Sequence, residues 1–362
     1  MITHKDHFHG SDLEKIEKIY GIKKEDIISF SANVNPLGIS PLMRERLTSN
    51  LDCISTYPDR EYTALRDSIG NYNNCDANDV IVGNGTTELI SLFIEIMHPK
   101  KAIVLGPTYS EYEREVTLNG GTTLYYPLKA ENDFELDINH FTSKLDASID
   151  MIILCNPNNP TSSSIPKSDM RHILDVCKEN DIYVLVDETY VEFVDNINAI
   201  SSVSLCTYYN NIIVLRGTSK FFASPGLRLG YAITGNKDLK KEILKRQDPW
   251  SINSLADIAG QIMFSDEKYI NDTRSLVSAE KNRMYELFSK DDRFRPYKPS
   301  ANFMLIEILD NDLDSEILFE QAIRENLMIR DCSTFPFLSN KFIRFCFMNP
   351  EDNDRLAQCL MR

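Results

Sequence analysis

The sequence predicts an α/β fold, with a large domain built on a mostly parallel central sheet flanked by helices and a smaller α+β domain. The middle of the chain alternates short apolar runs with amphipathic stretches, which is typical of parallel strands buried on both faces. The last third changes character, with a long helical region followed by alternating strands and helices. A length of 362 residues suits two domains of roughly 150 residues or more.

The elements of the large sheet are predicted from these runs. A short strand at 80–82 precedes a helix at 89–97, in which apolar residues recur at the helical spacing. Strands and helices then alternate as parallel sheets require. The predicted order is a strand at 101–105, a helix at 109–119, strands at 122–126 and 150–155, a helix at 167–180, and strands at 182–187 and 211–216.

The C-terminal third starts with a helical region at 247–289, which Asp248-Pro249 and Asp266 interrupt. A strand at 302–308, a helix at 314–326, a short strand at 328–330, a strand at 342–347 and a helix from Pro350 follow. The first forty-odd residues are expected to form an arm that packs on the small domain. The predicted division is an arm at 1–44, a large domain at 45–245, and connecting helices with the small domain at 246–362.

Composition excludes several classes of protein. Acidic residues number 54 and basic residues 39, and the net charge of −15 argues against a partner that is a nucleic acid. No apolar stretch approaches the roughly 18 residues of a membrane helix, and the N-terminus has no apolar leader, so we expect a cytoplasmic protein. The eight cysteines form no Cys-x-x-Cys pair, which predicts free thiols in a reducing compartment and no metal site.

A glycine-rich segment at 83–88 lies between the strand at 80–82 and the helix that follows. Glycine and small hydroxyl residues at a helix start present free N–H groups to an anion, so Gly85, Thr86 and Thr87 are candidate phosphate ligands. An ordinary turn with a threonine N-cap explains the same residues. The segment matches neither the dinucleotide fingerprint nor the P-loop.

Polar side chains follow two further strands at their carboxyl ends, where parallel sheets bind ligands. Asn159 lies in a loop that two prolines stiffen, although turns of this composition are common. Asp187 ends the strand at 182–187, and Tyr190 follows it. A carboxylate there needs a cationic or N–H partner if it is buried, and a simple N-cap role is the alternative.

Lys220 follows the strand at 211–216, between Ser219 and two phenylalanines. A lysine in apolar surroundings has a lowered pKa and can attack carbonyl groups. Arg228 lies further along the same segment and could hold an anion. Solvated surface charges are the ordinary alternative for both residues.

In their order and spacing, these four segments resemble the fold-type I pyridoxal-phosphate enzymes of the class I/II aminotransferase superfamily, from about residue 30 to the C-terminus. The resemblance implies pyridoxal 5'-phosphate as cofactor and three catalytic residues: Lys220 carries the cofactor, Asp187 keeps its ring nitrogen protonated, and Tyr109 stacks on its ring. It implies that Asn159 and Tyr190 contact the phenolic oxygen. The phosphate ligands that it implies are Gly85, Thr86, Thr87, Ser219 and Arg228.

Tyr57 matches a family tyrosine that reaches the cofactor phosphate from the partner subunit, which implies a homodimer with shared active sites. The sequence departs from the family pattern at two positions. Gly217 stands three residues before Lys220, where the family frequently has serine or threonine. A hydroxyl group that would bind the cofactor phosphate is therefore missing, and whether Thr218 replaces it is left open. Ser162 stands where the family usually has glycine.

Two arginines near the C-terminus indicate a substrate with two anionic groups. Arg344 matches the superfamily arginine that binds the substrate carboxylate, and Arg330 remains for a phosphate ester unless it pairs with Asp331 or a surface acid. Segments around His9, Asn33 and Arg330 resemble the threonine-phosphate decarboxylases of cobalamin biosynthesis, with Ser11 in place of their second glycine. By that match the substrate ligands are His9, Asn33, Arg330 and Arg344.

Three functions follow from these resemblances. The first is decarboxylation of L-threonine O-3-phosphate to 1-aminopropan-2-yl phosphate, so the expected partner is a small phosphorylated amino acid. The second is transamination of a phosphorylated substrate such as histidinol phosphate with 2-oxoglutarate. The third is a catalytically silent cofactor-binding or regulatory protein, which the intact Lys220, Asp187 and Arg228 disfavour.

Overall fold

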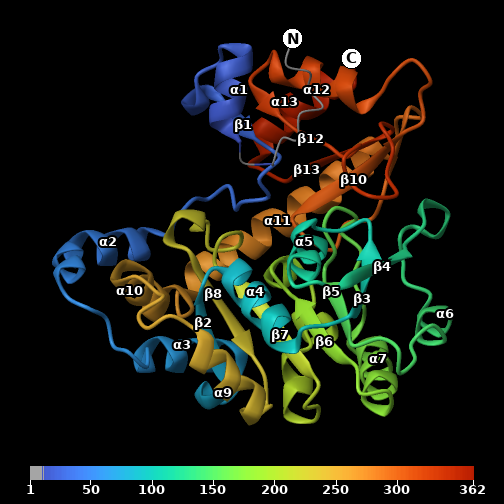
Figure 1. Cartoon of the computed structure of the whole chain (residues 1–362). Helices are drawn as coiled ribbons and strands as arrows, with labels where there is room; N and C mark the ends of the chain where they lie inside the picture. Colours follow the sequence, from blue (N-terminus) through green and yellow to red (C-terminus); the bar gives the residue numbers. More distant parts are fainter. Residues whose placement is uncertain (1–9, 11) are drawn as a thin grey trace.

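The computed structural model describes residue 10 and residues 12–362, and a seven-stranded sheet forms its largest layer (Figure 1). The strand order is β2-β8-β7-β6-β5-β3-β4. The strands β7, β6, β5, β3 and β4 pair in parallel, each with the next in this order. The strand β8 runs antiparallel to β7 and to β2. The strands are β2 (Val80–Asn84), β3 (Lys101–Gly106), β4 (Thr122–Pro127), β5 (Met151–Cys155), β6 (Tyr183–Asp187), β7 (Ile212–Gly217) and β8 (Leu229–Ile233).

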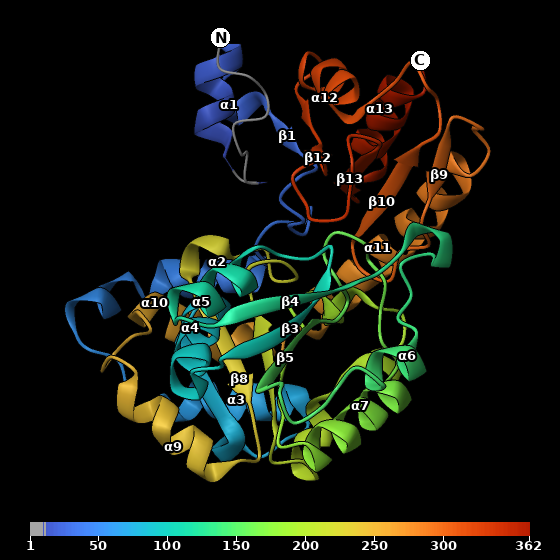
Figure 2. The ribbon, with the colours of Figure 1, turned by 45° about the vertical axis from the view of Figure 1, so that its right-hand side comes forward.

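Helices cover both faces of this sheet (Figure 2). On one face α4 (Thr86–Met97), α5 (Glu111–Leu118) and α9 (Lys237–Arg246) bury apolar side chains against alternate strand residues. On the other face α3 (Thr63–Asn73), α7 (Lys167–Glu179) and α10 (Ser254–Met263) do the same. Because both faces are buried, the strands read as continuous apolar runs. Two short helices, α6 (Ile138–Thr142) and α8 (Ile197–Ile200), lie in connections.

A second sheet has four antiparallel strands in the order β12-β13-β10-β9. The long helix α11 contacts this sheet and also the 3-10 turn that follows β6, so it joins the two layers (Figure 1). The elements are α11 (Glu267–Phe288), β9 (Phe294–Pro296), β10 (Phe303–Ile308), α12 (Ser315–Ile323), β12 (Arg330–Asp331), β13 (Phe342–Cys346) and α13 (Pro350–Leu360). Short 3-10 helices lie at Lys24–Asp26, Leu51–Ser55, Ala77–Asp79, Ala130–Asn132, Val191–Phe193, Val203–Thr207 and Pro225–Leu227.

The N-terminal segment contacts both layers. It contains α1 (Leu13–Tyr20), β1 (Ile28–Ser29) and α2 (Pro41–Ser49), and β1 pairs in parallel with β11 (Leu327–Met328). The Cys346 N–H then donates to the Phe30 carbonyl across 2.8 Å, and the Asn35 N–H donates to the Lys220 carbonyl across 3.0 Å. Residues 31–35 therefore run from the small sheet to the loop after β7. The division into 1–44, 45–245 and 246–362 stays a prediction.

The predicted strands and helices of the large sheet are confirmed to within a few residues at their ends. Asp266 does interrupt the C-terminal helical region, because its side chain caps α11 by accepting from the Tyr269 N–H. The single strand predicted at 328–330 is wrong. The chain leaves β11 and its partner β1 at Ile329 and joins β13 as β12 in another sheet. The strand β8 was not predicted, and α4 begins at Thr86, three residues before its predicted start.

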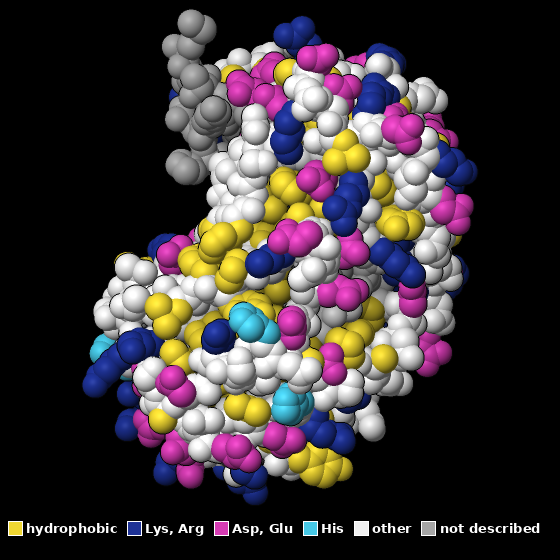
Figure 3. Space-filling model, turned by 90° about the vertical axis from the view of Figure 1, so that its right-hand side faces the viewer, with side chains coloured by type: hydrophobic (Ala, Val, Ile, Leu, Met, Phe, Trp, Pro, Cys, Tyr) yellow, Lys and Arg dark blue, Asp and Glu magenta, His cyan; other side chains and the backbone are white. Residues whose placement is uncertain are grey.

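The surface charges, the helices and the cysteines of the described residues bear on the classes considered from composition. Acidic and basic side chains are interspersed on the face shown in Figure 3, with no basic patch in that view. Among the described residues, no helix combines the length and apolar character that crossing a membrane requires. All eight cysteines are free thiols, and six of them are buried. The described residues hold no group of three or more side chains arranged for a metal ion.

Candidate active site

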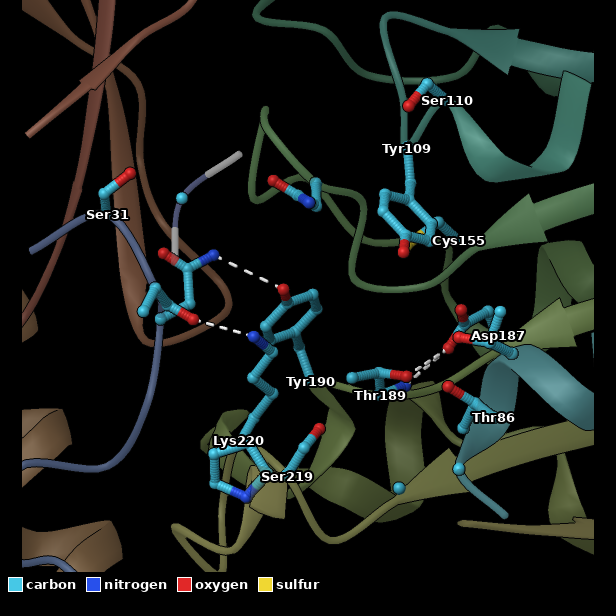
Figure 4. A pocket seen from close by; sticks show the side chains of 18 of the residues that line it. Ser31, Thr86, Tyr109, Ser110, Cys155, Asp187, Thr189, Tyr190, Ser219 and Lys220 are labelled. Carbon is cyan, nitrogen blue, oxygen red and sulfur yellow. Dashed lines mark hydrogen bonds between the residues drawn. The ribbon is translucent and has the colours of Figure 1, made fainter. Parts of the chain in front are cut away.

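A cavity of about 370 Å³ lies at the carboxyl ends of the parallel strands, and both sheets and the N-terminal segment line it (Figure 4). The structure brings most of the predicted residues together there. They are Asn33, Gly85, Thr86, Thr87, Tyr109, Asn159, Asp187, Tyr190, Ser219, Lys220, Arg228, Arg330 and Arg344. His9 lies outside the described residues, and Tyr57 does not line the cavity.

An anion cradle forms where β2 turns into α4. Gly85 has φ +81°, a conformation that favours glycine, and α4 starts at Thr86 with the free N–H groups of its first turn. A Cβ at Gly85 would come within 2.4 Å of the Arg228 guanidinium. Glycine therefore suits this position both through its backbone conformation and because it leaves the Arg228 guanidinium in place. Ser219 lines the same part of the cavity, so cation, hydroxyl and N–H donors converge.

Asp187 ends β6 and is buried with hydrogen bonds to both carboxylate oxygens. Its Oδ1 accepts from the Thr189 N–H at 2.9 Å and the Thr189 hydroxyl at 2.5 Å, and its Oδ2 accepts from the Tyr112 hydroxyl at 2.7 Å. Burial raises the pKa of Asp187, and the bonds from Thr189 and Tyr112 oppose that rise. The expected N–H partner of this carboxylate is thus the Thr189 backbone.

Lys220 lies after β7, across the cavity from Asp187, with Tyr190 and Thr189 between them (Figure 4). Its Nζ donates to the Ala32 carbonyl across 2.7 Å. Burial above all, together with the charges of Arg344 and Arg228, lowers the pKa of Lys220 to about 8. Such an amine is deprotonated near neutral pH more readily than a surface lysine, which suits attack on a carbonyl group.

Asn33 joins the N-terminal segment to the large sheet. Its Nδ2 donates to the Tyr190 hydroxyl at 3.4 Å, and the Asn302 side chain donates to its carbonyl at 3.0 Å. Its backbone has φ +56°, which asparagine tolerates better than most residues. Among the described residues its buried Oδ1 has no hydrogen-bond partner, so it remains available as an acceptor in the cavity.

Arg344 is buried and oriented from two sides. Its Nη1 donates to the Asn159 carbonyl oxygen, and its Nη2 donates to the Ser31 carbonyl at 2.6 Å. The Arg344 Nε is buried without an acceptor among the described residues. Because the Asn159 oxygen accepts from Arg344, the amide nitrogen of Asn159 is left to donate to a ligand.

Arg330 reaches the cavity from β12. Its Nη2 donates to the Thr334 hydroxyl at 3.0 Å, and its guanidinium lies 5.2 Å from the centroid of the Phe335 ring. Burial lowers the pKa of Arg330, and the charge of Arg344 adds to that effect. Arg330 and Arg344 are direct cross-strand partners in the β12–β13 register.

The structure shows what surrounds Gly217 and Ser162, the two positions at which the sequence departs from the family pattern. Thr218 does not replace the hydroxyl lost at Gly217, because it is buried and donates to the Leu229 carbonyl at 3.1 Å. Ser162 has φ +61°, which explains a preference for glycine, and its hydroxyl accepts from the Ala301 N–H at 2.9 Å. Ser162 therefore joins the Asn159 loop to the start of β10.

Tyr57 is 78% exposed, and its ring packs on Trp250 with the centroids 4.7 Å apart. Several lining residues were not predicted from the sequence. They are Gly10, Ser31, Ala32, Ser110, Tyr112, Cys155, Thr189, Gly217, Pro225, Leu229 and Phe335. The position of Thr189, two residues after Asp187, could have indicated its role, since short hydroxyl side chains often bond nearby carboxylates.

Fold and site together define a pyridoxal-phosphate-dependent enzyme, and comparison with known families agrees. The chain belongs to the aminotransferase class I and II family, whose model matches residues 25–360. Pyridoxal 5'-phosphate is the cofactor of this family.

Similar proteins in this family are named for two different reactions. A Caldanaerobacter subterraneus protein with the provisional name threonine-phosphate decarboxylase is 34% identical over 91% of this chain and 88% of its own length. The threonine-phosphate decarboxylase of Salmonella typhimurium is 29% identical over 97% of this chain and 95% of its own length. The structure of the histidinol-phosphate aminotransferase from Clostridium acetobutylicum has a TM-score of 0.85 and 31% identity, covering 91% of this chain and 97% of that one.

The residues present fit the cofactor. The Gly85 cradle with Arg228 offers positive charge and N–H donors to a phosphate, and a Cβ at Gly85 would displace the Arg228 guanidinium. The partly buried amine of Lys220 and the buried carboxylate of Asp187 lie on opposite sides of the same cavity. These groups match an aldehyde and a ring nitrogen at the two sides of a pyridine ring.

The lowered pKa of Lys220 predicts how the apoenzyme takes up its cofactor. Only the neutral amine attacks an aldehyde, so the rate of recombination should rise about tenfold per pH unit and level off above pH of about 8. Visible absorbance after mixing apoenzyme with pyridoxal 5'-phosphate measures this rate. A rise that continues to pH of about 10, as for an ordinary lysine, would contradict the burial argument.

Proposed function

We propose that the protein decarboxylates L-threonine O-3-phosphate to 1-aminopropan-2-yl phosphate and carbon dioxide, a reaction of cobalamin biosynthesis. The observation that carries the proposal is the facing pair Arg330 and Arg344 on β12 and β13. Both arginines reach the cavity that holds Lys220. Two cations side by side suit a small substrate that carries two anionic groups.

Each arginine suits one anionic group. Arg344 lies beside Asn159 and takes the substrate carboxylate in our proposal, as the superfamily match suggests. Arg330, which Thr334 and Phe335 hold in place, takes the phosphate. Asn33 adds a donor or acceptor between them, and His9 belongs to the proposed substrate ligands as well. Planar guanidinium groups bind carboxylate and phosphate through paired hydrogen bonds, which fixes the orientation of a small substrate.

The remaining residues hold the reacting groups and move protons. Bound pyridoxal 5'-phosphate supplies an electron-withdrawing ring that stabilises the charge left when the carboxylate departs. Asp187 holds a proton at the ring nitrogen, and Tyr109 contacts the ring face. Asn159 and Tyr190 donate to the phenolic oxygen, and Gly85, Thr86, Thr87, Ser219 and Arg228 hold the phosphate. Lys220 anchors the cofactor and lies where it can exchange protons.

The direct test is an assay of carbon dioxide from purified holoenzyme and L-threonine O-3-phosphate. We expect stoichiometric release, with slower release from serine phosphate, which lacks one methyl group. Release no greater than that of a Lys220→Ala variant would refute the proposal.

Transamination is the second candidate. The likeness to the histidinol-phosphate aminotransferase structure, at 31% identity, favours it, and the cavity with Arg330 and Arg344 also suits a phosphorylated substrate of this kind. Formation of glutamate from histidinol phosphate would then depend on 2-oxoglutarate as amino acceptor. Turnover of histidinol phosphate in preference to threonine phosphate would favour this reading.

We also propose a cytoplasmic homodimer in which Tyr57 reaches the partner's cofactor phosphate. Tyr57 packs on the partly exposed Trp250, and Leu51 and Ile54, which precede it in the sequence, are exposed as well. The free thiols suit a reducing compartment. Sedimentation analysis should give twice the chain mass of 41.5 kDa, and an active monomer would contradict the shared site.

A further inference from the structure

Tyr112 lies in the first turn of α5 and contacts two groups of the site. Its side chain is buried, and its hydroxyl donates to Asp187 Oδ2 across 2.7 Å. Its ring meets the Tyr109 ring edge-on, with the centroids 5.6 Å apart and 85° between the planes. Tyr112 therefore supports both the carboxylate and the aromatic ring that the proposed function assigns to the cofactor.

The hydrogen bonds at Asp187 are divided between two residues. Thr189 donates twice to Oδ1, and Tyr112 donates to Oδ2. Donors to a carboxylate favour its charged form, whereas desolvation favours the protonated form. For this fully buried group the two effects act in opposite directions, and the Tyr112 hydroxyl is one of the donors that lower the pKa of Asp187.

The basicity of Asp187 decides where a shared proton resides. A carboxylate that is a weak base leaves the proton on the ring nitrogen, whereas a stronger base removes it and gives a neutral pair. In a buried site the ionic and neutral forms are closely balanced, so one hydrogen bond to the carboxylate can shift the balance.

We propose that Tyr112 is a positioning residue that holds Asp187 ionised and thereby keeps the cofactor ring nitrogen protonated. This inference rests on the proposed role of Asp187. It gives a function in the chemistry to Tyr112, a buried residue that lines the cavity. Thr189 holds the other oxygen and fixes the carboxylate plane, so the two residues act on different atoms.

The test is Tyr112→Phe in the holoenzyme, because phenylalanine keeps the ring and its contact with Tyr109 but lacks the hydroxyl. A positive charge on the ring nitrogen disfavours a second positive charge on the Lys220 nitrogen attached to the cofactor. Loss of the charge on the ring nitrogen should therefore make the Lys220 nitrogen that is attached to the cofactor easier to protonate. The pH midpoint at which the visible absorbance of the cofactor changes should then rise by about one unit. We expect kcat to fall about tenfold with KM unchanged, since the substrate ligands are untouched.

Tyr125→Phe is the matched control. It removes a tyrosine hydroxyl that donates to Glu113 Oε2 at 2.9 Å, outside the cavity. The absorbance midpoint of this variant should equal that of the parent enzyme. A midpoint in Tyr112→Phe that also equals the parent value would overturn the inference.

Two further experiments distinguish a failure of this inference from a failure of the proposed role of Asp187. Asp187→Asn should shift the midpoint at least as far as Tyr112→Phe; if it does not, the assigned role of Asp187 fails and the inference with it. With a cofactor analogue that has carbon in place of the ring nitrogen, Tyr112→Phe should have no effect. A shift that persists with the analogue would show a packing effect and overturn the inference. The spectrum is read without substrate, so these results do not depend on which reaction the enzyme performs.

Discussion

Replacing Lys220 by alanine is expected to abolish turnover, by roughly 10⁴-fold or more, while the protein stays folded. The amine is the group that attaches the cofactor in our proposal, and no other lysine lines the cavity among the described residues. Its Nζ donates to the Ala32 carbonyl, and burial desolvates its charge. Removing a desolvated charge costs little stability, so Tm should change by only a few degrees.

Two readouts complete this experiment. The variant should lack the visible absorbance of lysine-attached cofactor and should show no carbon dioxide release. Lys240→Ala is the matched control, because burial also lowers the pKa of Lys240 to about 8, although this lysine bonds the Asn78 carbonyl away from the cavity. Full absorbance and activity in Lys220→Ala would show that the wrong lysine has been assigned.

Replacing Arg330 by alanine is expected to lower kcat/KM for threonine phosphate by roughly 10²-fold or more. Truncating one partner of a buried charged hydrogen-bond pair typically costs about 2–5 kcal/mol. The effect should be confined to phosphorylated substrates, because Arg344 still binds the carboxylate. Any turnover of unphosphorylated L-threonine should therefore stay at the parent level.

Arg295→Ala provides the control for charge and for the small sheet. Arg295 lies on β9, pairs with Asp133 and stacks on Tyr297, but it does not line the cavity. Its loss should leave selectivity between phosphorylated and unphosphorylated substrates unchanged. An equal loss of both activities in Arg330→Ala would refute a phosphate-specific role.

Much of the large sheet was predictable from sequence because its strands are buried on both faces and read as unbroken apolar runs. The strand β8 was not predicted because Gly230 interrupts its apolar run and because the strand directly follows the Lys220 segment. The break at Ile329 could not be foreseen, since a two-residue strand changes sheets there through pairing with distant residues. Strand order and register depend on long-range contacts that local patterns do not contain.

Within the site, residues whose chemistry is rare in their setting were predictable. A lysine among aromatic residues and a carboxylate at the tip of an apolar strand stand out, and the structure places both at the cavity. The Ala32 carbonyl that accepts from Lys220 left no signal, because every residue type supplies a backbone carbonyl. Tyr112 was missed because its contact with Asp187 joins two elements far apart in sequence.

The central claim is that the enzyme removes the carboxylate of a phosphorylated amino acid and leaves its amino group in place. L-threonine O-3-phosphate labelled with carbon-13 in the carboxylate and nitrogen-15 in the amino group tests this directly, with 2-oxoglutarate present and NMR as the readout. We predict that the carbon label appears as carbon dioxide and bicarbonate while the nitrogen label stays in the phosphorylated amine. Transfer of the nitrogen label to glutamate, with the carbon label retained in a phosphorylated keto acid, would contradict the claim.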